Sequence, residues 1–332
     1  MKKWNKFLCI TAVSIFVFSM TISGEAFAEK RIRVGSNRLG TSNYVQGATV
    51  ADIITKYAGD IVAEAVPLAG SVGNVKLIEK NDKMELALPL NVDCAAAIQG
   101  TSGFQKSLNI RCLMGNMDRY YAGVMARGDL PYKTWEELLK AKAAVRLYTQ
   151  AKGAGAELLA SRLLECGGAS YDDIKKWGGS VEFTDTENII NAFKDGRCDI
   201  FVLYVNKGHP VVSEIALSGK MRFLELSPEQ QKVLEAKYSL VPDKLPAGVF
   251  KNQEQAVSTV MASTIAIVHS SMDDETAYKI TKAIMGHKED MIKGHKSFND
   301  FDLKKAASPE FLGGVPLHPG AVKYFKEIGQ VK

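Results

Sequence analysis

Three glycine-rich turns carry the residues best suited to bind an anion. They lie at 35–43, 69–74 and 150–156, each between an expected strand and an expected helix. Backbone N–H groups at a helix N-terminus have no partner within the helix and attract carboxylates and other anions. The three turns together predict an amide-lined site for an acid, although one such turn alone is also an ordinary α/β connection.

The first turn, GSNRLGTSN, places a cation and several small polar residues before a helix. From it we predict ligand contacts by Arg38, Gly40, Thr41, Ser42 and Tyr44. The spacing is not the GxGxxG of a dinucleotide site, so a dinucleotide is not indicated.

The second turn, AGSVGN, admits more than one role for Ser71. The residue can cap a helix, or it can contact a ligand together with Asn74. The pattern also approaches the G-x-S-x-G of a serine hydrolase, with Ala for the first Gly. That enzyme would need a later histidine: His209, His269, His295 or His318. We favour the ligand contact and keep a secreted hydrolase as the less favoured alternative.

The third turn, QAKGAGA, repeats the arrangement in the second half of the chain. We predict ligand contacts by Lys152, Gly153, Ala154 and Gly155, with Lys152 adding a positive charge suited to a carboxylate. A solvent-exposed Lys152 is the plainer alternative. The Walker pattern is absent, so a nucleotide phosphate is not indicated.

Further polar residues follow other expected strands. Asn91 and Asp93 come after 85–89, and Lys207 and His209 come after 200–204. Asp93 could cap its helix or hold an ammonium group, whereas Lys207 could pair with an acid. No HExxH motif, His/Cys cluster or EF-hand loop appears, so we expect no metal and no cofactor.

The elements that must position these turns alternate along the chain. Strand-like runs lie at 31–35, 61–68, 85–89, 145–148, 181–183 and 200–204, with helical stretches between them. Such alternation predicts mostly parallel sheets covered by helices. Longer strand-like runs at 118–127 and 256–268 could cross between two lobes. We therefore expect lobe 1 at 29–122 plus 262–332 and lobe 2 at 123–261.

Residues 1–28 have the pattern of a secretory signal. Three lysines precede an apolar run at 7–22, which is shorter than the roughly 20 residues of a spanning helix. Small residues at Ala26 and Ala28 predict cleavage before Glu29. We expect an exported protein without stable membrane insertion. Four cysteines would remain, as two disulfides or as buried thiols: Cys94, Cys112, Cys166 and Cys198.

The composition fits a globular chain with a small-molecule partner. The 332 residues are 46% hydrophobic, and 42 basic side chains oppose 37 acidic ones for a net charge of +5. This length suffices for two domains. No cluster of Lys and Arg concentrates the charge, so nucleic acid is not an expected partner.

These turns, in this order, resemble the TAXI family of solute-binding proteins, the extracytoplasmic receptors of tripartite ATP-independent periplasmic (TRAP) transporters. The resemblance covers nearly all of 29–329, and its most specific parts are GSVGN with the following LI and the closing HPGAVKYFKE. Two turns depart from the family pattern: GTSNYV replaces a Gly-Gly-Thr-Tyr run, and KGAGAE lacks the usual hydroxyl groups.

The resemblance implies a two-lobed α/β periplasmic binding protein of class II, with a Venus-flytrap fold and a two-strand hinge. It implies a binding protein rather than an enzyme. The ligand would be a small carboxylate or amino acid, captured by lobe closure and delivered to an ion-driven TRAP permease. The receptor of an ATP-driven importer is the alternative with the same fold.

Overall fold

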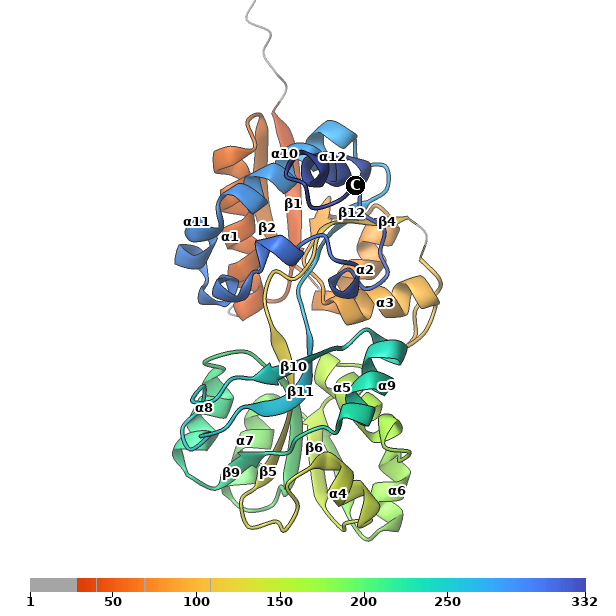
Figure 1. Cartoon of the computed structure of the whole chain (residues 1–332), viewed down its shortest axis with the longest axis vertical. Coiled ribbons are helices and arrows are strands. Elements are labelled where there is room, and N and C mark those ends of the chain that lie inside the picture. Colours follow the sequence, from red (N-terminus) through yellow and green to blue (C-terminus); the bar gives the residue numbers. More distant parts are fainter. Residues whose placement is uncertain (1–28, 40, 69, 108) are drawn as a thin grey trace, which may run out of the picture.

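The computed structural model describes residues 29–39, 41–68, 70–107 and 109–332, which form two α/β lobes (Figure 1). The expected signal segment 1–28 and the expected ligand contact Gly40 lie outside the described residues. Two segments of chain, 115–119 and 263–265, pass between the lobes. The finer division into 29–122 plus 262–332 and 123–261 remains our proposal.

Lobe 1 is built on a five-stranded sheet of order β2-β1-β3-β12-β4. Four of its strands, β1 to β4, run in the same direction, and β12 runs antiparallel to both of its neighbours. The strands are β1 (Lys30–Ser36), β2 (Ile61–Pro67), β3 (Leu86–Ala87), β4 (Ile110–Met114) and β12 (Ala266–His269). The α-helices are α1 (Ser42–Tyr57), α2 (Gly70–Glu79), α3 (Asn91–Gln99), α10 (Asp274–Gly286), α11 (Lys288–Gly294) and α12 (Pro319–Glu327). Short 3-10 helices are η1 (Lys296–Asp300), η2 (Leu303–Lys305) and η3 (Pro309–Phe311).

Lobe 2 is built on a seven-stranded sheet, in which β10-β11-β5-β8-β6-β7 form the main order and β9 pairs with β5. Strand β6 is parallel to β7 and β8, whereas β5 is antiparallel to its neighbours. The strands are β5 (Tyr120–Arg127), β6 (Arg146–Gln150), β7 (Ser180–Thr184), β8 (Ile200–Val205), β9 (Met221–Phe223), β10 (Val241–Leu245) and β11 (Val257–Ala262). The helices are α4 (Trp135–Lys140), α5 (Gly155–Cys166), α6 (Tyr171–Lys176), α7 (Thr186–Lys194), α8 (Pro210–Leu217) and α9 (Pro228–Tyr238).

The long strand expected at 256–268 is divided into β11 and β12. Between them, Ser263 donates its N–H to the Asn91 side chain at 3.0 Å, and Thr264 donates its N–H to Asp118 at 2.8 Å. The N–H of Ile265 bonds to the carbonyl of Pro89. The N–H groups of residues 263–265 therefore cannot form the hydrogen bonds of one continuous strand, and the chain passes from one sheet to the other.

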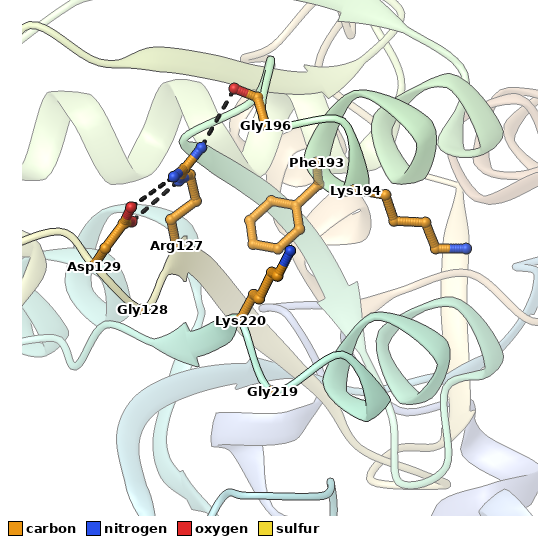
Figure 2. A pocket seen from close by; sticks show the side chains of 8 residues that line it. All are labelled: Arg127, Gly128, Asp129, Phe193, Lys194, Gly196, Gly219 and Lys220. Atoms are coloured by element: carbon orange, nitrogen blue, oxygen red, sulfur yellow. Dashed lines mark hydrogen bonds and ion pairs between the residues drawn. The ribbon is translucent and has the colours of Figure 1, made fainter.

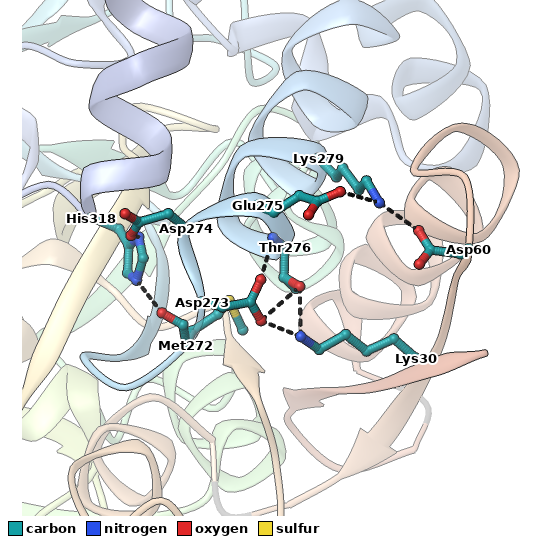
Figure 3. Close-up of polar contacts among 9 residues, drawn as sticks. All are labelled: Lys30, Asp60, Met272, Asp273, Asp274, Glu275, Thr276, Lys279 and His318. Atoms are coloured by element: carbon teal, nitrogen blue, oxygen red, sulfur yellow. Dashed lines mark hydrogen bonds and ion pairs between the residues drawn. The ribbon is translucent and has the colours of Figure 1, made fainter. Parts of the chain in front are cut away.

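The closing HPGAVKYFKE element packs α12 against α10 at the end of lobe 1 that is distant from lobe 2 (Figure 1), and Figure 3 shows His318 of this element beside Met272. Buried His318 caps α12 and lies 2.9 Å from the carbonyl oxygen of Met272. A Cβ at Gly320 would lie 2.2 Å from the carbonyl oxygen of Asp274, so only glycine allows this approach. The most specific part of the sequence pattern thus has a packing role.

The two lobes share part of one core next to the crossing segments. Val92, at the start of α3, is buried with apolar residues of lobe 2, and Leu90 packs against the same cluster. In Figure 1, α3 lies at the base of lobe 1 above α5 and α9 of lobe 2. All four described cysteines are free thiols and three of them are buried, which agrees with the thiol alternative rather than with disulfides.

Candidate functional site

The sheets bring the predicted turns to the lobe edges that face each other. In lobe 1 the turns after β1, β2 and β3 share one edge because these strands are parallel. In lobe 2 the turns after β6, β7 and β8 share an edge for the same reason. Contacts between the lobes join these edges: Asn91 Nδ2 donates to the carbonyl of Ser239 at 3.0 Å, and Lys207 Nζ donates to Asp300 at 2.5 Å.

The first turn enters α1 through Thr41, whose hydroxyl accepts the N–H of Tyr44 at 3.2 Å. Ser42 is exposed at the first position of the helix, and its Oγ lies 2.9 Å from Nε2 of His295. Arg38 is exposed and Tyr44 is partly buried. This turn therefore presents a capped helix N-terminus with a hydroxyl group held by a histidine.

Ser71 does not cap α2, because the helix already begins at Gly70. Gly70 has a φ of +75°, and a Cβ there would lie 3.3 Å from the Asn37 side chain, so glycine suits this entry. The Ser71 hydroxyl donates to Asp93 and accepts the N–H of Leu90 at 2.9 Å. Ser71 thus contacts a carboxylate rather than any histidine, and the described geometry lacks the Ser–His pair of the hydrolase alternative.

Asn74 and Asn91 are both buried and serve the framework. The Asn74 Nδ2 group donates to the carbonyl of Ser36 at 3.0 Å, whereas its Oδ1 atom has no partner in the described chain. The Asn91 amide bonds both to Ser239 in lobe 2 and to Ser263 between the lobes. Asn91 therefore connects α3 to the lobe junction.

Asp93 lies in the first turn of α3 and is 3% exposed. It is not the helix cap, since Leu90 occupies that position without a side-chain bond. Burial raises the pKa of the Asp93 carboxyl, while the hydrogen bond from Ser71 and the charge of Arg162 act in the opposite direction. This electrostatic link places an acid of lobe 1 close to a cation of lobe 2.

Arg162 is the main candidate site residue that the turn motifs missed. It lies on α5, is 4% exposed, and its guanidinium carbon is 5.1 Å from the centroid of the Tyr238 ring. Within the described part of the chain it forms no ion pair with a carboxylate. A sequence signal existed: Arg162 interrupts the buried stripe of Leu159, Leu163 and their neighbours on α5. A buried cation that forms no ion pair is costly, and a bound anion would relieve that cost.

Tyr204, at the end of β8, adds a second unsatisfied group beside Arg162. Its hydroxyl oxygen is buried and has no hydrogen-bond partner among the described residues. Burial raises the pKa of this phenol, and the charge of Asp93 also raises it. The charge of Arg162 and its side-chain N–H groups, directed at the phenol, lower the pKa. The three side chains therefore form one inter-lobe cluster, which we call the Arg162 cluster: Arg162, Tyr204 and Asp93.

The third turn leads directly to this cluster. Gly155 begins α5, and a Cβ there would lie 3.9 Å from the ring of Tyr204. Ala154 occupies the cap position without a side-chain bond, and the N–H of Gly153 donates to buried Glu157 at 3.0 Å. Lys152 is exposed, with Nζ 5.0 Å from the centroid of the Phe183 ring.

The last two predicted contacts follow β8. Lys207 is paired with Asp300 across the lobes, so its charge already has a partner. His209 occupies the N-cap position of α8 without a side-chain bond to the helix, and its Nδ1 atom is buried without a partner in the described ranges. Burial lowers the pKa of His209, which keeps the imidazole neutral at pH 7.

A separate cavity of about 430 Å³ lies at the end of lobe 2, away from the predicted contacts (Figure 2). Arg127 lines it and bonds to Asp129 and to the carbonyl of Gly196, while Phe193 and Lys220 form another wall. Over the described ranges, no group of three or more His, Cys, Asp or Glu side chains is placed to hold a metal ion. None of the described helices is long and apolar enough to cross a membrane.

Solved structures with similar folds are solute-binding proteins. A TctC solute-binding protein from Polaromonas has a TM-score of 0.55 at 15% identity, covering 82% of this chain and 90% of its own. The periplasmic binding protein BugD has a TM-score of 0.52 at 14% identity, covering 92% and 99%. PhnD1 from Prochlorococcus marinus, solved with methylphosphonate, has a TM-score of 0.51 at 12% identity, covering 91% and 100%.

These likenesses identify the fold as that of a two-lobed periplasmic binding protein, as the sequence predicted. Residues 34–329 match the NMT1-like family. Since the match spans most of the sequence, the chain belongs to the NMT1-like family.

Proposed function

We propose that this protein is the extracytoplasmic receptor of a TRAP transporter, of the TAXI type, and that it captures a small carboxylate or amino acid between its lobes. The observation that carries the proposal is Arg162, a buried cation at the lobe junction that forms no ion pair with a carboxylate of the described residues. The acid group of the ligand would bind its guanidinium and accept the hydroxyl proton of Tyr204. A carboxylate fits the fork of a guanidinium with two parallel hydrogen bonds.

The predicted turns complete this site. The N-termini of α1 and α5 offer backbone N–H groups, and Ser42 offers a hydroxyl. Asp93 would bind an ammonium group, so an amino acid would use both charges of the Arg162 cluster. Charged hydrogen bonds contribute about 1.5–3 kcal/mol each. Three or four of them would supply the roughly −8 kcal/mol of a micromolar receptor after the costs of closure and immobilisation.

We expect lobe closure because the proposed ligand contacts are divided between the two lobes. A ligand bound to Arg162 of lobe 2 and to α1 of lobe 1 makes all its contacts only when the lobes are together. It therefore shifts the population toward the closed state. The closed receptor would then present its surface to the permease. Export through the signal at 1–28 would place the receptor in the periplasm, and the proposed activity needs neither a metal nor a cofactor.

A thermal-shift screen of the mature chain tests the proposal. It would compare monocarboxylates, dicarboxylates, amino acids, sugars and metal ions. We expect a raised melting temperature with an acid and no rise with sugars or metals; stabilisation by sugars or metals alone would refute the proposal. The neighbouring genes test the TRAP assignment. If they encode a transport ATPase rather than a TRAP permease, the protein is the receptor of an ATP-driven importer, and the proposed ligand site is unaffected.

A further inference from the structure

A continuous chain of hydrogen bonds runs from Ser42 on α1 to Asp118 between the lobes. Ser42 Oγ lies 2.9 Å from Nε2 of His295, and Nδ1 of His295 lies 2.7 Å from Oγ of Ser297. Nε2 of Gln46 lies 2.7 Å both from that Ser297 oxygen and from Oδ2 of Asp118. The chain of contacts thus joins residues far apart in the sequence.

The Asp118 carboxylate determines which group donates and which accepts in each bond of this chain. An ionised carboxylate only accepts, so Gln46 must turn its NH₂ group toward Asp118. The same NH₂ group then donates to Ser297, whose own hydroxyl proton is free for His295. Tyr120 agrees with this orientation, because its hydroxyl donates to the other amide atom, Oε1 of Gln46, at 3.3 Å.

The backbone fixes the tautomer of His295 independently. The N–H of Ser297 donates to Nδ1 at 3.2 Å, and a backbone N–H cannot accept. Nδ1 is therefore the unprotonated nitrogen of a neutral ring, and the ring proton is on Nε2. Burial lowers the pKa of His295, which favours the neutral ring at pH 7. The Nε2–H group must then donate to Ser42.

We propose that His295 is a positioning residue of the ligand site: its Nε2–H group occupies the Ser42 oxygen and leaves the Ser42 proton to be donated to an acceptor oxygen of the ligand. This inference rests on the proposed function, because it takes α1 as one side of that site. Ser42 would therefore select an acid oxygen and disfavour a ligand amine at this position.

Histidine ¹⁵N NMR tests the tautomer without a ligand, with His295 assigned by its loss in H295Q. We expect the Nε2–H tautomer in the wild type at pH 7.5. In Gln46→Met, which removes the amide between Asp118 and Ser297, we expect the same Nε2–H tautomer, because the backbone N–H of Ser297 still donates to Nδ1. The matched control is Gln330→Met, which removes the amide that donates to the Leu303 carbonyl elsewhere in lobe 1. An Nδ1–H tautomer in the wild type would overturn the inference.

Calorimetric titration with L-glutamate, succinate and methylphosphonate tests the role in binding. For the acid that binds the wild type most tightly, we expect Ser42→Ala and His295→Asn to lower the affinity by about ten-fold, which is the effect of one charged hydrogen bond. Asn can cap η1 but is too short to reach Ser42, whereas the longer His295→Gln retains an N–H donor and should bind within about three-fold of the wild type. Q330M should bind like the wild type.

The outcomes separate the inference from the proposed function. If the wild type binds none of the three acids, the proposed function fails and the inference fails with it. If the wild type binds but Ser42→Ala and His295→Asn bind equally well, only the inference fails. If H295Q loses as much affinity as H295N while both stay folded by circular dichroism, His295 does not act through its Nε2–H donor.

Discussion

The binding turns of the two lobes differ in whether their polar groups already have partners. In lobe 1, Ser42, His295, Ser297, Gln46 and Asp118 form a connected chain of hydrogen bonds, although Oδ1 of Asn74 in the second turn has no partner among the described residues. In lobe 2, the guanidinium of Arg162 has no carboxylate, and the Tyr204 hydroxyl has no partner in the part of the chain that the structure describes. Lobe 1 is thus organised before a ligand arrives, whereas lobe 2 holds groups that a ligand would satisfy.

This difference separates stability from affinity. Groups with partners stabilise the fold, so their removal costs stability. Groups buried without partners destabilise the fold, so their removal costs affinity but not stability. The two lobes should therefore respond to substitution in different ways.

Arg162→Met should give the largest effect. Loss of the only proposed buried cation for the acid should weaken binding by roughly 100-fold or more, while the melting temperature should stay level or rise because a buried charge that forms no ion pair is removed. Titration calorimetry and thermal unfolding measure both. Arg197→Met, at an exposed pair with Asp195, is the control and should bind like the wild type. A large loss of stability in R162M without ligand would show that Arg162 is paired within the fold.

Asp118→Asn should change how stability depends on pH. Burial and the charge of Asp300 raise the Asp118 pKa from 3.8 to about 6, although hydrogen bonds from Thr264 and Gln46 oppose the shift. The folded state therefore holds this proton at pH values where the unfolded chain has released it. This group stabilises the fold at pH 4 and loses that contribution, about 3 kcal/mol, as the pH rises through about 6.

Urea unfolding of the wild type and D118N between pH 4 and 7 measures this contribution as the difference between the two pH profiles. Asp199→Asn is the contrasting control, because bonds from Arg146 lower the Asp199 pKa and its contribution is lost as the pH falls. If the free energy of unfolding depended on pH in the same way for the wild type and D118N, Asp118 would not be a buried group with a raised pKa.

Tyr204→Phe should separate affinity from stability most cleanly. The change removes only a hydroxyl without a partner, so stability should be unchanged or slightly higher. If the hydroxyl donates to the ligand acid, affinity should fall by about ten-fold. Calorimetry together with thermal unfolding decides the matter, and unchanged affinity would place the ligand elsewhere than beside Tyr204.

Lys207→Met should give the smallest effect. Lys207 is nearly half exposed and paired with Asp300, and such pairs contribute about 0–1 kcal/mol. Affinity should fall by about three-fold or less, and the difference should shrink at 1 M salt. A loss above 30-fold would instead restore Lys207 as the direct ligand contact that the sequence suggested.

The sequence predicted what depends on local pattern and missed what depends on distant contacts. Alternating strands and helices located the turns before α1, α2 and α5, and the closing element was recognised from its residues alone. The capping alternative for Ser71 was wrong, because α2 already begins at Gly70. The break between β11 and β12 was missed because Asn91 and Asp118 bind its N–H groups from far along the chain.

Arg162 shows why the site itself was only partly predictable. Turn motifs draw attention to helix starts, but this side chain lies two turns into α5, and only the fold shows that it forms no ion pair with a carboxylate of the described residues. Ser42 was predicted as a contact, whereas its partner His295 was considered only for a hydrolase built on Ser71. Pairing between such distant residues cannot be read from spacing.

The most direct test of the account is a crystal structure of the mature protein with the acid that stabilises it most in the thermal-shift screen. We predict that an oxygen of the acid group lies within hydrogen-bond distance of the Arg162 guanidinium and that the same molecule contacts the N-terminus of α1. The account would be contradicted if the acid bound elsewhere, for example in the cavity that Arg127 lines in lobe 2, and no anion lay beside Arg162.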